Sequence, residues 1–286
     1  MRTYATLLQI VVGCTLLPLG LHAEGIDTEH LFGFTIGSDV GEAGEREFQN
    51  QATGRFGKST GTYRALTNSA ELEFVPVKNF RLEFSAVAAS YHVGGVAGFD
   101  DVNQTGLQGA SVDFRYRFLD RESSPFGMVF DAEPHADRLD ETSGQHVRAY
   151  ETDFALAFDR ELIPNKLVAA VNFLYQPEWT NFLATGTTEH DVTIGVAGAM
   201  MAQVQPGVLI GGEARYLRKY EGFGPDVFTG HALFVGPTLY LQLSKRSRLT
   251  AAWSFQVAGH SAAMPGSLDL VNFERHQARL IYGINF

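Results

Sequence analysis

The sequence predicts an all-β protein: a transmembrane, antiparallel, up-and-down β-barrel of about twelve strands that follows a cleaved signal peptide. Three observations predict it. Apolar and polar residues alternate along many stretches, the connections between these stretches alternate between short and long, and the chain ends on an aromatic residue, Phe286. A strand exposed to lipid must pair all its backbone groups, so strands cross a bilayer only in a closed barrel.

The first 23 residues have the layout of a secretory signal peptide, in which one basic residue precedes an apolar core and small residues lie near Ala23. We expect cleavage after Ala23, with residues 24–286 forming a single outer-membrane barrel domain. A spanning helix is one alternative, but Pro18 and Gly20 interrupt an apolar run that is shorter than the ~20 residues a helix needs. A lipoprotein is another, because Cys14 follows VVG, yet the residues after Cys14 are apolar rather than polar.

Charge and cysteine content exclude several functions. Cys14 is the only cysteine, so the exported chain can form no disulfide and no thiolate metal site. Removal of the leader deletes one base and no acid, which changes the net charge from -10 to -11. Nucleic-acid binding needs a basic footprint, so we expect no nucleic-acid partner.

The alternating runs and the turn residues between them place twelve strands. The even-numbered connections, such as VPVKN, LIPNK and SKRS, are short, whereas the odd-numbered ones, such as GHSAAMPGSLDLVN, are long. This pattern is typical of outer-membrane barrels with tight periplasmic turns and long outer loops, and it predicts that both termini are periplasmic. The predicted strands lie near 30–38, 62–74, 80–93, 106–119, 125–133, 148–160, 166–177, 189–203, 207–218, 231–243, 248–258 and 274–286.

The alternation also predicts which face meets lipid. Phe114, Tyr116 and Phe118 point one way along their strand, while Asp113 and its charged neighbours point the other. Charges are costly on the lipid face, so the charged row is expected to line the lumen. Its acids are Glu71, Glu73, Glu83, Asp113, Asp131, Glu133, Glu151, Asp153 and Glu213, and its bases are Arg81, Arg115, Arg117, Arg215 and Arg279.

These inward charges have two interpretations. They could form a salt-bridged packing that closes a narrow barrel, or a polar conduit whose ring of charges sets selectivity. The width of a twelve-stranded barrel lies between filled eight-stranded barrels and open sixteen-stranded porins, so it permits either.

Two resemblances support the architecture. The ending LIYGINF resembles the C-terminal signal of bacterial outer-membrane barrels, with Tyr282 and Phe286 at the aromatic positions that the insertion machinery reads. HLFGFTIGSDVGEAGE, GRFGKSTGTY and AELEFVPVKNFRLEFSA resemble an uncharacterised family of Gram-negative outer-membrane barrel proteins, over about the first third of the mature chain. The resemblance implies a bacterial outer-membrane location, and it implies no catalytic residue.

The sequence gives little support for nucleotide binding, catalysis or metal binding. ATGRFGKS (52–59) fits a relaxed phosphate-loop pattern, but it lacks the buried strand and the helix that such a loop needs, so we expect no nucleotide. Its bases, Arg55 and Lys58, could instead contact lipopolysaccharide phosphates. No Ser, His and acid share the spacing of a lipid hydrolase, and we expect no catalytic residue. His135, His146, His231 and His260 fall in different loops or loop edges, so we expect no metal site and no cofactor.

The sequence therefore favours a passive outer-membrane channel or facilitator for small polar or ionic solutes. A non-conducting barrel that binds lipopolysaccharide or a partner through long outer loops is the first alternative, and a barrel lipid hydrolase is the second. The expected partners are outer-membrane lipid, lipopolysaccharide and, during biogenesis, the barrel-insertion machinery. The charged lumen is the observation that favours the channel.

Overall fold

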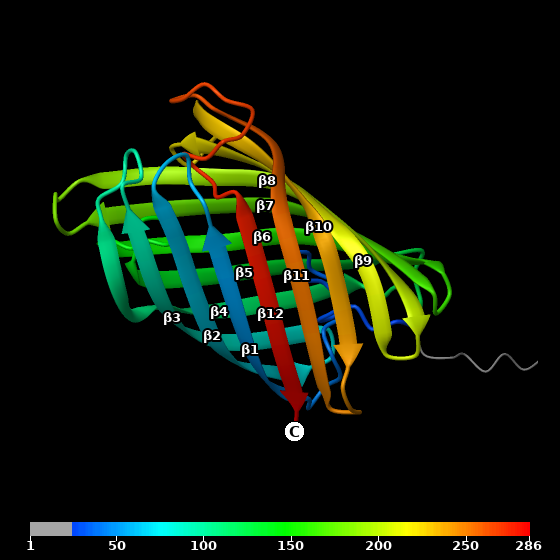
Figure 1. The fold of residues 1–286 in the computed structure, drawn as a ribbon. Helices are drawn as coiled ribbons and strands as arrows, with labels where there is room; N and C mark the ends of the chain where they lie inside the picture. The colour runs from blue at the N-terminus through cyan, green and yellow to red at the C-terminus, as the bar shows by residue number, and fades with distance from the viewer. Residues whose placement is uncertain (1–24) are drawn as a thin grey trace, which may run out of the picture.

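The structure, a computed structural model, describes residues 25–286, so the expected leader and its cleavage site at Ala23 lie outside the described residues. Twelve antiparallel strands form a closed barrel in which each strand pairs with its neighbours in the chain and β1 pairs with β12 (Figure 1). This confirms the predicted fold class. The strands are β1 (Arg46–Phe56), β2 (Thr62–Val77), β3 (Phe80–Gly94), β4 (Val102–Leu119), β5 (Gly127–Leu139), β6 (His146–Ile163), β7 (Leu167–Phe182), β8 (Thr188–Gln205), β9 (Val208–Glu221), β10 (Val227–Gln242), β11 (Ser247–Ser261) and β12 (His276–Asn285).

None of the residues from 25 onward belongs to a helix long and apolar enough to cross a membrane.

The alternation of apolar and polar residues produces the two faces of the barrel wall. On β4, Phe114, Tyr116 and Phe118 are exposed on the outside, while Asp113 and Arg115 are buried on the inside. Successive side chains of a strand point to opposite faces, so this sequence places its charges inside and its aromatic rings outside. An outer surface of this kind is stable when hydrocarbon surrounds it.

The first strand lies elsewhere than predicted. It is Arg46–Phe56, which was expected to belong to a long outer loop, whereas residues 30–38 form no strand. Arg46–Phe56 has polar residues on both faces, so its alternation is weak, and its pairing with β12 and β2 identifies it as a strand. Leu31 and Phe32, which gave 30–38 the appearance of a strand, are buried inside the barrel instead.

Most strands are longer than predicted, and the odd-numbered connections are shorter. At the end that holds Phe286, here called the C-terminal rim, the chain turns at 78–79, 120–126, 164–166, 206–207 and 243–246. At the opposite end, here called the loop rim, it turns at 57–61, 95–101, 140–145, 183–187, 222–226 and 262–275. Only the last of these is long, so the prediction of uniformly long outer loops was wrong. The predicted strands ended too early because both faces become polar near a rim, which hides the alternation.

Two tight turns at the C-terminal rim depend on asparagine. Asn79 and Asn165 adopt left-handed backbone conformations, with φ of 68° and 56°. Asparagine tolerates this conformation better than other residues with a Cβ, because its short side chain hydrogen-bonds locally. These positions let strands such as β2 and β3 reverse within two residues.

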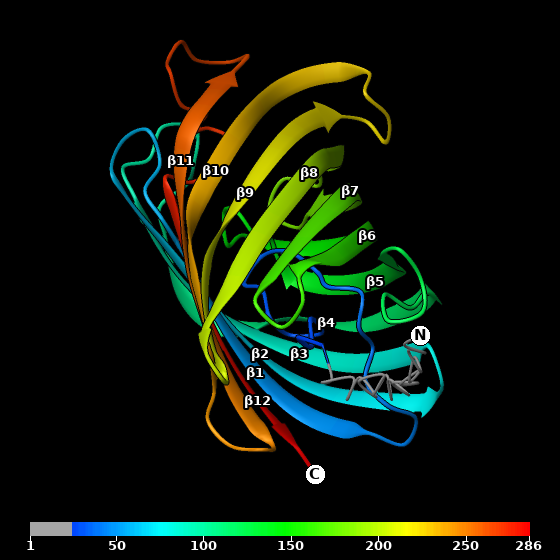
Figure 2. The same ribbon diagram turned by 90° about the vertical axis from the view of Figure 1, so that its right-hand side faces the viewer.

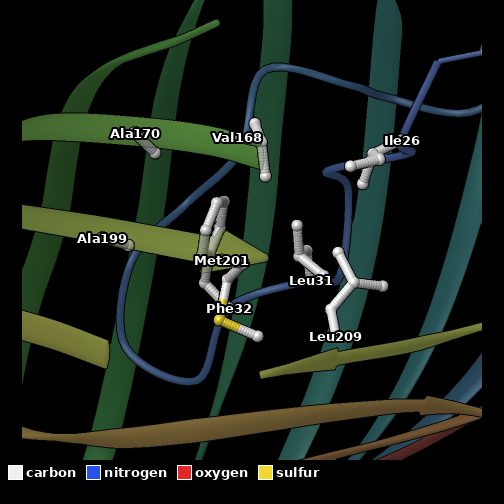
Figure 3. Close-up of a cluster of buried hydrophobic side chains, with 8 residues drawn as sticks. All are labelled: Ile26, Leu31, Phe32, Val168, Ala170, Ala199, Met201 and Leu209. Atoms are coloured by element: carbon white, nitrogen blue, oxygen red, sulfur yellow. The ribbon is translucent and has the colours of Figure 1, made fainter. Parts of the chain in front are cut away.

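The barrel interior is occupied by residues 25–45, here called the lumen segment, which precedes β1. It runs inside the ring of strands, as the dark blue chain in Figure 2 shows. Its apolar side chains Ile26, Leu31 and Phe32 pack against the inner faces of β7, β8 and β9 (Figure 3). The wall residues of this cluster are Val168, Ala170, Ala199, Met201 and Leu209.

Candidate functional site: the charged lumen

The lumen segment is anchored by buried polar side chains of the wall. Glu213 on β9 accepts hydrogen bonds from the backbone N–H groups of Gly33 and Phe34, at 2.7 and 2.8 Å. Asn172 on β7 accepts one from the N–H of Ile36 at 2.6 Å and donates one to its carbonyl oxygen at 2.9 Å. These bonds satisfy backbone groups that belong to no sheet, so they fix the path of the segment.

Asp159 on β6 provides a third anchor, near the C-terminal rim. One carboxylate oxygen accepts from the N–H of Ser38 at 2.7 Å and from the hydroxyl of Thr28 at 2.5 Å, and the other accepts from the hydroxyl of Ser38 at 2.6 Å. The carboxylate is buried. Three donors to one buried carboxylate make this a strong, specific attachment.

The arginines of β3 and β4 are paired with carboxylates. Arg81 lies 3.1 Å from Asp113 and 3.2 Å from Glu73, and Arg115 lies 2.6 Å from Asp131. These charges neutralise one another on the wall beside the lumen segment. This part of the row matches the interpretation as salt-bridged packing.

The acids of β5, β6 and β7 lack such partners. Within residues 25–286, no lysine or arginine nitrogen lies within 4.0 Å of a carboxylate oxygen of Glu133, Asp137, Glu151, Asp153 or Glu178. These five residues, here called the acidic wall, line the central cavity together. These five carboxyl groups therefore gather on one part of the wall without a lysine or arginine partner within that distance.

Two further arginines point into the lumen, Arg215 on β9 and Arg279 on β12, and they are here called the basic wall. The guanidinium carbons of Arg215 and Arg279 lie 4.0 and 4.7 Å from the ring centre of Phe34, so the two cations contact this ring of the lumen segment. Arg279 also donates to the carbonyl oxygen of Gly33 at 3.0 Å. Because β12 lies half the ring away from β6, Arg279 faces the acidic wall across the lumen, whereas Arg215 on β9 lies a quarter of the ring from β6.

A cavity of about 450 Å³ lies between the two walls. The lumen segment lines it from the side of the C-terminal rim, through residues such as His30 and Phe34. Connections 140–145 and 262–275 contribute lining residues from the loop rim. The cavity has room for on the order of fifteen waters at ~30 Å³ each.

Both of these connections fold into the barrel mouth. Glu141 forms an ion pair with Arg55 of β1, and the hydroxyl of Tyr63 donates to the carbonyl oxygen of Thr142 at 2.8 Å. Phe273 of the long connection stacks edge-on against the inward-facing Phe234, with ring centres 6.2 Å apart. The mouth is therefore narrowed from two directions.

The two bases of the phosphate-loop-like stretch point inward. Arg55 belongs to β1 and is bound to Glu141, and the ammonium group of Lys58 donates to the carbonyl oxygen of Val271 at 3.1 Å. Burial lowers the pKa of Lys58 to about 8. Contact of these two bases with lipopolysaccharide phosphates, which was one prediction, is inconsistent with this arrangement.

The structure places all fourteen predicted charges inside the barrel. Glu73, Arg117 and Glu213 contact the lumen segment through His30, Asp39 and residues 33–34 respectively. The other eleven predicted charges line the cavity: Glu71, Arg81, Glu83, Asp113, Arg115, Asp131, Glu133, Glu151, Asp153, Arg215 and Arg279. The side chains of Tyr282 and Phe286, the two residues of the predicted assembly signal, are exposed on the outer face.

Sequence reasoning missed further lining residues. His135 and Asp137 were missed because the predicted strand ended at 133, whereas β5 continues to Leu139. Glu178 was missed in the same way, since β7 extends to Phe182. Continuing the period-two count past the predicted ends would have found all three. The lumen segment gave no such signal, because its apolar alternation looks like that of a strand.

Comparisons with known proteins agree with this architecture. A family model described as "Family of unknown function (DUF6662)" matches residues 24–286. The COG4313 outer membrane channel from Pseudomonas putida F1 is structurally similar, with a TM-score of 0.59 and 11% identity over 87% of this chain and 98% of that one. The NanC porin is similar with a TM-score of 0.51 and 9% identity, over 84% of this chain and 100% of that one. No curated protein matches the sequence. At these identities the likeness shows the fold, a porin-like outer-membrane β-barrel.

Proposed function

The chain belongs to the family of unknown function DUF6662, and we propose that it is a passive outer-membrane channel for small polar or ionic solutes. The observation that carries the proposal is the cavity of about 450 Å³ between the acidic and basic walls. A barrel that served only as a scaffold could fill this space with apolar side chains, which would avoid burying unpaired charge.

We place the C-terminal rim in the periplasm and the loop rim outside the cell. Short turns gather at the C-terminal rim and the single long connection lies at the loop rim, which is the usual polarity of outer-membrane barrels. Solutes then enter past connections 140–145 and 262–275. They leave past the lumen segment, which lies inside the barrel and narrows the proposed route.

The lumen charges favour cations. Arg81 and Arg115 are neutralised by neighbouring carboxylates, so they contribute little to the field in the cavity. The five acids of the acidic wall have no lysine or arginine partner within 4.0 Å among the described residues, and they outnumber Arg215 and Arg279. Low-dielectric walls concentrate this field, so cations are expected to pass more readily than anions.

Planar-bilayer recordings of the purified barrel test the proposal. Discrete conductance steps are expected for the wild type, and larger steps for a variant that lacks residues 25–44, because deletion widens the narrow part. A variant that shortens connection 183–187 is a control, since none of its residues lines the cavity. Absence of steps from both the wild type and the deletion variant would contradict the channel.

One observation favours a second function, a non-conducting barrel that binds a partner. The lumen segment runs inside the barrel and is fixed there by hydrogen bonds to Glu213, Asn172 and Asp159. A silent wild type together with a conducting deletion variant would support this function. The partner would then have to bind at a rim, where the chain is accessible from water.

A further inference from the structure

A cluster of metal-ligating side chains lies on the acidic wall, where β5 and β6 pair. Glu133 is directly opposite Asp153 in the register, and His135 is directly opposite Glu151. All four side chains point into the cavity and line it. Directly opposite residues have Cβ atoms about 4.5–5.5 Å apart. The ligand atoms of Glu133, His135 and Asp153 all lie within 4.8 Å of one another.

The histidine at the centre of this cluster lacks a hydrogen-bond partner. Its Nε2 atom is buried, and it makes no hydrogen bond within residues 25–286. The nearest acceptors are Oε1 of Glu133 and Oδ2 of Asp153, each 3.7 Å away, which is too long for a hydrogen bond. Ligand atoms each about 2.1 Å from a tetrahedral zinc ion are about 3.4 Å apart, so this spacing suits a shared cation better than a direct contact.

Flanking strands orient the two carboxylates. The hydroxyl of Ser111 on β4 donates to Oε1 of Glu133 at 2.6 Å, and the amide of Gln176 on β7 donates to Oδ1 of Asp153 at 2.8 Å. The second hydrogen bond leaves Oδ2 of Asp153 free to face His135. Metal sites commonly hold their ligands through such outer hydrogen bonds, which fix the ligand geometry before the ion arrives.

The electrostatic surroundings also favour a cation. Glu133 and Asp153 have no lysine or arginine within 4.0 Å in the described chain, and the acid Glu151 lies beside them. A second cluster, Glu29, His30 and Glu73, has similar ligand types. There, however, Arg81 lies 3.2 Å from Glu73 and already supplies the positive charge. Only the first cluster lacks a resident cation.

We propose that Glu133, His135 and Asp153 form a lumenal binding site for a divalent transition-metal cation. Imidazole is a better ligand for zinc than for calcium or magnesium, which prefer oxygen, so Zn²⁺ is the appropriate probe. The remaining coordination positions face the cavity and are open to water. The inference goes beyond the proposed function, because binding of the ion does not require conduction.

Isothermal titration of chelator-treated, folded barrel with zinc chloride tests the site. The wild type is expected to show a saturable site that binds zinc at least tenfold more tightly than calcium or magnesium. His135→Gln and Asp153→Asn should each weaken zinc binding at least tenfold. His92→Gln, which alters an exposed histidine on β3, is the matched control and should bind as the wild type does. Heat-modifiable migration in gels verifies that each variant is folded.

Two results would overturn the site. One is absence of saturable zinc binding by the wild type. The other is zinc binding that His135→Gln leaves unchanged, which would place the ion elsewhere, such as at the cross-strand pair His231 and His260. Titration does not depend on conductance, so zinc binding by a silent barrel keeps the site and rejects the channel. Conductance without zinc binding would keep the channel and reject the metal site.

Discussion

The individual charges of the lumen differ in what surrounds them. Asp159 and Glu213 are buried acceptors for the lumen segment, and Asp113 is paired with Arg81 and Arg115. Removal of a buried acceptor leaves its donors unsatisfied, which costs more than the net value of the bond. Asp159 and Glu213 are therefore expected to control the position of the lumen segment rather than the charge of the pore.

Replacement of Glu213 by alanine should loosen the lumen segment. Gly33 and Phe34 lose hydrogen bonds to a charged acceptor, each contributing about 1.5–3 kcal/mol. Hydrogen exchange at these two amides should accelerate by on the order of 10- to 100-fold. Hydrogen–deuterium exchange mass spectrometry measures this, with Glu221→Ala on the exposed end of β9 as the control. Unchanged exchange would show that other contacts suffice to hold the segment.

Neutralisation of the acidic wall should change ion selectivity. Glu151 and Asp153 lie two apart on β6 and face the same section of the cavity, so Glu151→Gln with Asp153→Asn removes two charges from one place. The cation preference should fall by roughly half, because Arg215 and Arg279 remain. Reversal potentials in a salt gradient measure it, and Asp101→Asn in the exposed connection 95–101 is the control. Anion preference in the wild type would mean that Arg215 and Arg279 dominate the field.

Among the elements, β12 is predicted well by the alternation of its residues, whereas the lumen segment is predicted wrongly by its own alternation. β12 has clear alternation, with Leu280, Tyr282 and Ile284 exposed outside and Arg279 inside. The lumen segment alternates as well, but the backbone N–H groups of Gly33, Phe34, Ile36 and Ser38 donate to side chains of the wall. Phe286 follows β12, and its N–H donates to the carbonyl oxygen of Arg46 at 3.1 Å, beside the seam that closes the barrel.

Deletion of Phe286 should lower the amount of folded barrel without preventing export. The expected leader is unchanged, but the terminal aromatic of the proposed insertion signal is lost. Heat-modifiable migration of membrane fractions measures the folded share. Phe223→Ala is a suitable control, because Phe223 is a similarly exposed aromatic at the loop rim. Equal folded shares for deletion variant and wild type would mean that Phe286 is dispensable for insertion.

At the scale of the whole molecule, closure makes the fold compatible with a membrane. The register between β1 and β12, from Glu47 opposite Asn285 to Phe56 opposite His276, leaves neither strand as a free edge. The outer face then presents apolar side chains, while the charges turn inward. A barrel of this kind is stable in lipid and would expose a large apolar surface in water.

Cell fractionation should recover the protein in the outer membrane, and urea washes should not extract it. The physical reason is the apolar outer wall, which peripheral proteins lack. Immunoblots of separated membranes and of the periplasm measure the distribution, with a soluble periplasmic protein as the control. Recovery in the soluble periplasm would contradict membrane insertion.

The sequence alone determined the barrel, eleven of its twelve strands and the inward direction of residues such as Glu151 and Arg279, because these follow from local alternation and from the need to pair every backbone group in lipid. Only the tertiary structure decided that residues 30–38 lie inside the barrel and that Arg46–Phe56 closes the sheet. A strand and an inserted segment share the same local pattern, and the partners of their backbone groups distinguish them. The pairing of Arg81 and the isolation of His135 likewise depend on neighbouring strands, which local sequence does not encode.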